Sequence, residues 1–215
     1  MRKAVQQRRT GILTYGITPP KSSYDEAKRR DVAEKQAARI RTLAVDGLVI
    51  YDIQDESTRT REERPFPYLE CIDPVLYAYD YLNAVNCPKV VYQCVGTRDS
   101  ASLVQHLKRI EEHQDLSVLV GAASRAQKGT LRLPEAYALK RAAFSDLPLG
   151  GVLIAERHEQ RREEDKRTLR KMDEGCSFFI SQAVYSAVAS KNVLSDLYYL
   201  CEEQARPLPP VLITL

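Results

Sequence analysis

The sequence predicts an α/β fold, a (β/α)₈ barrel of which about seven βα units are present. Seven short apolar runs with strand character recur along the chain, and helical patterns lie between most of them. Alternating strands and helices imply parallel strands joined by right-handed crossovers. About seven such units in 215 residues favour a barrel over an open sheet.

The order of elements follows from apolar periodicity and from the residues that bound each run. Strands are predicted at 11–17, 47–53, 89–95, 116–120, 150–155, 176–181 and 211–215. Helices are predicted at 23–42, 74–82, 100–113, 134–144, 159–174 and 187–204. Thr97 and Asp99 are suitable caps for the third helix, and Pro134 suits the first turn of the fourth.

The segment 168–185 is the most informative part of the chain. Gly175 is expected to end a helix, because glycine adopts the left-handed cap conformation without a Cβ clash. The apolar run 176–180 is typical of a strand covered on both faces. Ser181 and Gln182 follow where that strand would emerge, and in a βα barrel this end of the strands binds ligands.

The sequence predicts a single barrel domain at 11–215 after an N-terminal extension at 1–10. The last predicted strand, 211–215, has no helix and no eighth strand behind it. A parallel barrel without its last unit has two unpaired edges. We therefore expect a barrel truncated at strand seven, a fragment, or else one closed by a partner or a swapped segment.

Composition excludes several classes of protein. The net charge is +3, and basic residues are interleaved with acids, which argues against nucleic-acid binding. No apolar run approaches the roughly 20 residues of a membrane helix. The five cysteines are far apart, which favours neither a zinc site nor a disulfide framework. A reduced, cytoplasmic protein is expected, and a homo-oligomer is compatible with the sequence.

Short motifs in successive units resemble the methylenetetrahydrofolate reductase family. Each motif falls near the end of a predicted strand or in the helix before one, and the resemblance is collinear from about residue 11 to the end. The matching residues are 18–21 (TPPK), 57–59 (STR), Cys94 with Val95, Glu156 with His158, Lys171, Asp173, Gly175, and Ser181 with Gln182.

The resemblance implies an oxidoreductase of one-carbon metabolism and methionine biosynthesis. Such a flavin-containing barrel reduces 5,10-methylenetetrahydrofolate to 5-methyltetrahydrofolate, with FAD as cofactor and NADH or NADPH as reductant. By resemblance, Lys171 and Arg59 would lie near the cofactor pyrophosphate and His158 near its ribose or phosphates. Gln182 would contact the polar edge of the folate pterin, since an amide both donates and accepts hydrogen bonds.

The chain departs from this family at its catalytic positions. Gly16 stands where the family has a proton-donating glutamate, Val91 stands in place of a histidine, and 121–124 replaces a flavin-binding segment. Flavin binding is therefore expected to be weakened or absent. Asp52 or Glu56 is the predicted proton donor instead, provided that burial or crowding by other carboxylates raises its pKa.

Two other classes of function stay open at this point. One is a non-catalytic barrel that holds a folate or a nucleotide, or that serves as a subunit of an enzyme. The other is a metal-assisted lyase using Asp52, Asp55 and Glu56, although these acids also suit pairing with Arg59 and Arg61, and no metal site is assigned. The three site residues of the later units also have structural explanations. Lys171 could be a favourable cation near a helix C-terminus, and His158 could lie in a solvated loop. Gln182 could bond backbone groups at a strand end.

Overall fold

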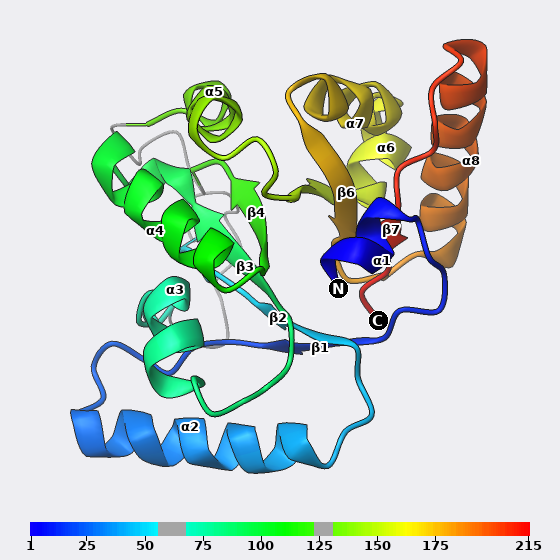
Figure 1. The fold of residues 1–215 in the computed structure, drawn as a ribbon. Coiled ribbons are helices and arrows are strands. Elements are labelled where there is room, and N and C mark those ends of the chain that lie inside the picture. Colours follow the sequence, from blue (N-terminus) through cyan, green and yellow to red (C-terminus); the bar gives the residue numbers. More distant parts are fainter. Residues whose placement is uncertain (56–67, 123–130) are drawn as a thin grey trace. The chain divides into compact units, whose positions relative to one another are not determined.

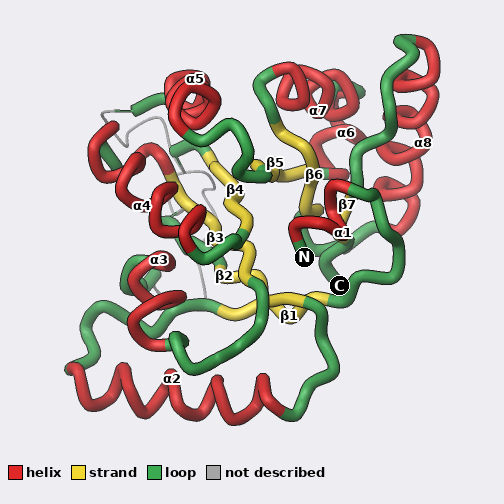
Figure 2. Tube along the Cα trace, in the orientation of Figure 1, coloured by secondary structure: helices red, strands yellow, loops and turns green. Residues whose placement is uncertain are grey.

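The computed structural model describes residues 1–55, 68–122 and 131–215, and it divides into two compact units. The first unit contains residues 12–147 together with Met1, and the second contains residues 2–11 and 148–215. Parallel strands alternate with helices in both units (Figures 1 and 2). All seven predicted strands are present, so the predicted α/β class is confirmed.

The first unit is a four-stranded parallel sheet in the order β1-β2-β3-β4. In Figure 1 its helices lie along one face of the strands. Its elements in chain order are β1 (Thr14–Ile17), α2 (Glu26–Arg41), β2 (Gly47–Ile50), α3 (Pro74–Leu76), the π-helical turn η2 (Tyr77–Tyr81), β3 (Lys89–Cys94), the 3₁₀ turn η3 (Val95–Thr97), α4 (Ser100–Glu112), β4 (Leu116–Val120) and α5 (Leu133–Ala143).

The second unit is a parallel three-stranded sheet in the order β5-β6-β7. Its first helix, α1, lies in the predicted N-terminal extension and contacts β6. Its elements in chain order are α1 (Arg2–Gln6), β5 (Leu149–Leu153), α6 (Ala155–Arg161), α7 (Glu164–Asp173), β6 (Cys176–Ser181), α8 (Ala187–Glu203) and β7 (Val211–Leu212).

Side-chain oxygens placed just before the helices explain where four of them begin. Asp25 caps α2 by accepting from the Lys28 backbone N–H at 2.7 Å, and Asp99 caps α4 in the same way through Ser102. Ser186 caps α8, and Asp73 caps α3. Each cap satisfies a backbone donor that has no partner within its helix.

One predicted helix is broken in two. The range 159–174 becomes α6 and α7, because Arg162 adopts a left-handed conformation with φ of 51° after α6. Gly175, with φ of 101°, follows α7 and is the predicted helix stop. The sequence pattern gives no signal for this break, because charged residues occur both in the turn and in the two helices beside it.

Strand register sorts the side chains of the first unit onto two faces. Gly16 pairs with Val49, and Val49 pairs with Val90, so these positions share one face with Tyr92. Lys89 points to the other face, where its ammonium lies 5.9 Å from the ring centroid of Tyr79 in η2. Tyr92 is therefore on the face opposite to the one that η2 covers.

The core of the second unit is built on β6 and α8. Phe178, Phe179 and Ile180 of β6 are buried, as are Ala189, Val193, Leu197 and Cys201 at four-residue spacing along α8. The remaining residues of α8 are half-buried or exposed. Within the described ranges, no helix has the length and apolarity that crossing a membrane requires.

Candidate functional site

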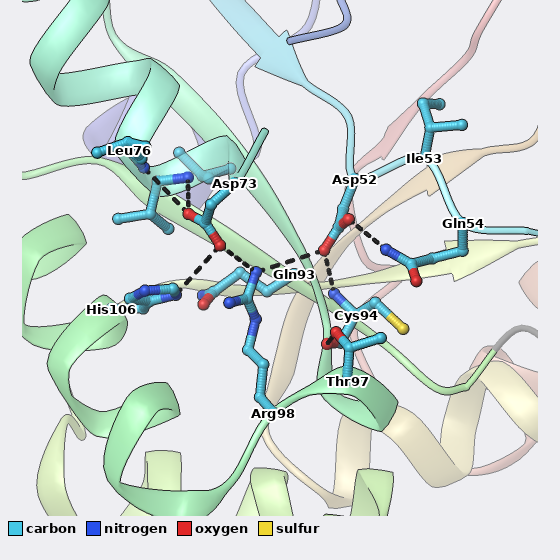
Figure 3. A network of polar contacts seen from close by, with 12 residues as sticks. Asp52, Ile53, Gln54, Asp73, Leu76, Gln93, Cys94, Thr97, Arg98 and His106 are labelled. Atoms are coloured by element: carbon cyan, nitrogen blue, oxygen red, sulfur yellow. Dashed lines mark hydrogen bonds and ion pairs between the residues drawn. The ribbon is translucent and has the colours of Figure 1, made fainter. Parts of the chain in front are cut away.

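A network of polar side chains lies at the carboxyl ends of β2 and β3. We call it the Asp52 network, and its members come from the segment after β2, from the N-cap of α3, from the end of β3, from the turn between η3 and α4, and from α4 (Figure 3). In βα folds this end of the strands is where ligands bind. The members are Asp52, Gln54, Asp73, Cys94, Arg98 and His106.

Asp52 is the centre of this network. Its Oδ2 accepts from the Cys94 backbone N–H at 2.6 Å, and its Oδ1 accepts from the Gln54 amide at 2.5 Å. The Arg98 guanidinium lies 3.6 Å from Oδ2, and only 8% of the Asp52 side chain is exposed. Groups from two strand ends thus hold a buried carboxylate in one orientation.

Arg98 joins Asp52 to a second carboxylate. Its guanidinium lies 2.6 Å from Asp73 Oδ2, while Asp73 Oδ1 accepts from the backbone N–H groups of Val75 and Leu76 at the start of α3. The imidazole of His106 in α4 lies 3.9 Å from the same Asp73 oxygen. Figure 3 shows Arg98 between the two carboxylates, which share this cation.

The pKa values of the two carboxylates shift in opposite directions. Burial raises the pKa of Asp52, and the Cys94 N–H and Arg98 only partly oppose it. Burial acts on Asp73 in the same direction, but Arg98, His106 and the α3 N–H groups together hold its pKa below the ordinary value. Burial also lowers the pKa of His106, so its imidazole is neutral at pH 7.

A buried side-chain amide next to the network, that of Gln93, has an oxygen that could accept a further hydrogen bond. Gln93 in β3 has no exposed surface, and its Nε2 donates to Ser117 Oγ of β4 at 3.1 Å. Its Oε1 is buried without a hydrogen-bond partner among the described residues. Buried polar atoms in folded proteins are rarely left unsatisfied, so this oxygen marks a place where a further donor would be favourable.

The second unit holds three predicted site residues, and two of them have side-chain partners within the unit. His158 is 1% exposed, and its Nε2 lies 2.8 Å from Asp196 Oδ2 of α8. Lys171 donates to the Val152 carbonyl of β5 and lies 3.9 Å from Glu164. Gln182 is exposed just after β6, and its backbone N–H donates to the Leu153 carbonyl at 2.8 Å.

Lys171 belongs to a cluster of charges around one carboxylate, which we call the Glu164 cluster (Arg157, Glu164, Arg167 and Lys171). Glu164 has no exposed side-chain surface and accepts from the Ile154 backbone N–H at 3.2 Å. Arg157 and Arg167 lie 3.1 and 3.4 Å from its Oε2. Burial lowers the pKa of Lys171 against the attraction of Glu164.

The remaining predicted site residues, Glu56 and Arg59, lie outside the described residues. No group of three or more His, Cys, Asp or Glu side chains within 1–55, 68–122 and 131–215 is arranged to hold a metal ion. Asp73, Arg98 and His106 are functional candidates that the sequence interpretation missed. An Asp directly before Pro74 is a helix-start signal that would have drawn attention to Asp73.

Comparison with solved structures finds a relative of substantial sequence identity. A structure of an uncharacterized protein from Clostridium thermocellum that binds two copies of 5-methyl-5,6,7,8-tetrahydrofolic acid is 38% identical, with a TM-score of 0.83. The match covers 100% of this chain and 68% of that protein. No protein-family model matches the chain, and no curated protein matches it.

Two more distant structures are similar in fold alone. One is 2,3-dimethylmalate lyase of the PEP mutase/isocitrate lyase superfamily, with 10% identity, a TM-score of 0.57, and 99% of this chain and 76% of that chain covered. The other is a GH10 endoxylanase from a sugarcane soil metagenome, with 7% identity, a TM-score of 0.50, and 98% and 68% covered. Both are (β/α)₈ barrel proteins, in agreement with the predicted architecture.

The predicted membership of the methylenetetrahydrofolate reductase family is wrong. No family model matches, and the structures similar to this chain give no evidence for that family: the 38%-identical one is described only as an uncharacterized protein that binds 5-methyl-5,6,7,8-tetrahydrofolic acid. The motifs misled because a glycine after a helix and polar residues at strand ends, as at Gly175 and Gln182, occur in βα barrels of many functions. The chain belongs to the same family as the folate-binding protein of Clostridium thermocellum.

Proposed function

We propose that this chain binds a reduced folate of the 5-methyltetrahydrofolate type. It acts by holding this ligand and does not catalyse the reduction that forms it. The observation that carries the proposal is 38% identity over the whole chain with a protein that binds two copies of that compound. The relationship supports ligand binding and says nothing of hydride transfer. FAD and NADH or NADPH, expected from the sequence, are not needed for this function.

The Asp52 network supports the proposal through its chemistry. A pterin ring presents adjacent N–H donors on its 2-amino group and N3, and a carboxylate is the natural acceptor for such a pair. Gln54, Cys94 and Arg98 approach three of the about four acceptor positions of the Asp52 carboxylate. The Asp52 carboxylate can therefore accept one more hydrogen bond, and its orientation is already fixed.

The charge of the network favours the same ligand. Asp52 and Asp73 carry two negative charges when ionised, and Arg98 supplies one positive charge between them. His106 is neutral at pH 7 because burial lowers its pKa. The excess of acceptor groups suits a donor-rich heterocycle better than an anion such as a phosphate.

The test is calorimetric titration of the full chain with 5-methyltetrahydrofolate. We expect saturable binding, weakened roughly tenfold or more by Asp52→Asn, because an acceptor for a charge-assisted hydrogen bond is lost. Asp146→Asn is the matched control, since Asp146 is an exposed acid of the same unit. Circular dichroism establishes that both variants are folded.

Two results would overturn the proposal. Absence of detectable binding to wild-type protein at millimolar ligand would remove folate binding altogether. Oxidation of NADH or NADPH that depends on added methylenetetrahydrofolate would instead show catalysis and replace the holding function. Absorbance in the flavin region of the purified protein, measured beforehand, separates a flavin-dependent reaction from a flavin-free one.

A further inference from the structure

The imidazole of His106 gives the Asp52 network a side chain of the type that titrates closest to neutral pH. Its Nδ1 lies 3.9 Å from Oδ2 of Asp73, the same oxygen that pairs with the Arg98 guanidinium at 2.6 Å. This Nδ1 is buried and has no hydrogen-bond partner among the described residues, while 22% of the whole side chain is exposed. A proton taken up by the ring would therefore place a second cation beside a carboxylate that already has one (Figure 3).

The charged groups around α4 decide when His106 takes up that proton. Burial lowers the pKa of His106, Asp73 opposes this shift, and the cations Arg98 and Arg109 act in the same direction as burial. In the neighbouring η2, the carboxylate of Asp80 is paired with Arg109. The strand β4, which packs against α4, contains no titratable side chain.

The titratable groups of α5, the other helix that packs against α4, have partners elsewhere or are exposed. Glu135 pairs with Arg132 at 2.6 Å, and the Lys140 ammonium donates to the Ser145 carbonyl at 3.2 Å. The other titratable side chains of α5 are those of Tyr137 and the exposed Arg141. The carboxylate that acts on the imidazole is thus the one at the N-cap of α3.

Protonation of His106 removes the charge excess that favours a donor-rich ligand. With a neutral imidazole, two ionised carboxylates and one guanidinium leave the network with one negative charge in excess. An imidazolium balances that charge. It also attracts Oδ2 of Asp73, which weakens the hold of Asp73 on Arg98 and allows the guanidinium to move closer to Asp52 than its present 3.6 Å.

From these contacts we infer that His106 is a pH switch on the folate affinity of the Asp52 network. This inference rests on the proposed function, because it names the regulator of that same site. The neutral imidazole leaves the Asp52 carboxylate able to accept from the ligand, and the imidazolium releases Arg98 to occupy that carboxylate. Because burial holds the pKa of His106 below its ordinary value of 6.5, affinity is complete near neutral pH and falls as the solution becomes more acidic.

The experiment is calorimetric titration of the full chain with 5-methyltetrahydrofolate at several pH values from about 5 to about 8, the range in which histidine titrates. On acidification, the wild-type affinity should fall by about fivefold more than that of His106→Gln, whose amide takes up no proton. Titration of the ligand is common to both proteins. The comparison reports His106 together with its coupling to Asp52 through Arg98.

His113→Gln is the matched control. His113 is exposed at the C-cap of the same helix and is not a member of the network. This variant should keep the pH profile of the wild type. Circular dichroism across the same pH range establishes that the wild type and both variants stay folded.

A second measurement follows the proton itself. NMR signals of the His106 ring, assigned by elimination with His113→Gln and His158→Asn, give the pH at which its imidazole is half protonated, even if His106→Gln fails to fold. Coupling between two bound species is reciprocal, so saturating 5-methyltetrahydrofolate should move this midpoint to lower pH. The midpoint of His113 should not move. A His106 side chain that serves packing alone would have the same midpoint with and without the ligand.

The outcomes separate this inference from the proposed function. If 5-methyltetrahydrofolate binds wild type and His106→Gln with the same pH profile, or leaves the His106 midpoint unchanged, the switch is disproved and folate binding stands. If the wild type binds no folate even at about pH 8, above the ordinary titration range of histidine, the proposed function fails and the switch fails with it.

Discussion

The Asp52 network of the first unit and the Glu164 cluster of the second unit have opposite charge balances. In the network, two carboxylates share the Arg98 guanidinium, whereas in the cluster Glu164 is shared by Arg157, Arg167 and Lys171. Glu164 also accepts from the Ile154 backbone N–H. Three cations thus lie within 3.9 Å of Glu164, whereas among the described residues Arg98 is the cation that lies near Asp52.

Burial and perturbed pKa values therefore do not by themselves identify a ligand site. Burial shifts the pKa of both Asp52 and Lys171, yet the charge of Glu164 is offset by cations of the chain itself. We expect the Glu164 cluster to affect stability alone, and the Asp52 network to affect both stability and ligand affinity. Substitutions in the two groups of residues test this expectation.

The largest effect is expected from Glu164→Ala. Removing this fully buried carboxylate leaves three cations without their shared partner, which should lower the free energy of unfolding by about 3–5 kcal/mol. Urea denaturation measures the loss, with Glu163→Ala as control, because Glu163 is exposed and its side chain makes no cap hydrogen bond. Saturating 5-methyltetrahydrofolate should stabilise the folded variant as it does the wild type. A selective loss of folate affinity at unchanged stability would contradict this expectation.

Arg98→Ala should have the next largest effect and should change both properties. It leaves two carboxylates without their bridging cation, and we expect a loss of about 2–3 kcal/mol in unfolding free energy. Folate affinity should also fall, because the orientation of Asp52 is no longer fixed from the Arg98 side. Arg98→Lys should lie between the two, since an ammonium cannot span both carboxylates as a guanidinium does. If folate affinity survives Arg98→Ala unchanged, the network does not orient the ligand.

Much of the fold could be predicted from local patterns, whereas the network could not. The seven strands follow from apolar runs, and Gly175 is the helix stop that its sequence position predicts, because these signals depend on neighbouring residues. The contact between Arg98 and Asp73 joins residues 25 positions apart, and no local pattern encodes it. Asp52 could be placed near a strand end, but its bond to the Cys94 N–H depends on how β2 and β3 pair.

His158→Asn should have a smaller effect, confined to stability. His158 is buried and bonded to Asp196, so the shorter side chain leaves a small void and a lost hydrogen bond, at a cost of about 1–2 kcal/mol. Thermal unfolding and urea denaturation measure the change. Affinity for 5-methyltetrahydrofolate should stay at the wild-type value. The sequence resemblance predicted a cofactor contact for His158, and a loss of FAD or NADH binding by a fully stable variant would favour that role.

The smallest effect concerns the pH dependence of stability. Burial raises the pKa of Asp52, so the folded state holds this proton to higher pH than the unfolded state does. The resulting stabilisation is complete below the ordinary Asp value of about 4 and is lost as pH rises through the folded-state pKa. A tenfold difference in proton affinity between the folded and unfolded states corresponds to about 1.4 kcal/mol. Asp73, whose pKa is lowered, acts in the opposite sense, because its stabilisation is present above the ordinary value and is lost as pH falls toward its folded-state pKa.

The measurement is urea denaturation between pH 3 and 7, about the range that spans ordinary carboxylate titration. Asp73 is present in both proteins, so the difference between wild type and Asp52→Asn reports the titration of Asp52 together with its coupling to Asp73 through Arg98. The wild-type advantage over Asp52→Asn should decline as pH rises, since only the wild type loses a favourably bound proton. An advantage that grows with pH would mean that Arg98 and the Cys94 N–H outweigh the burial of Asp52, and the network would then resemble the Glu164 cluster in having its charge satisfied from within.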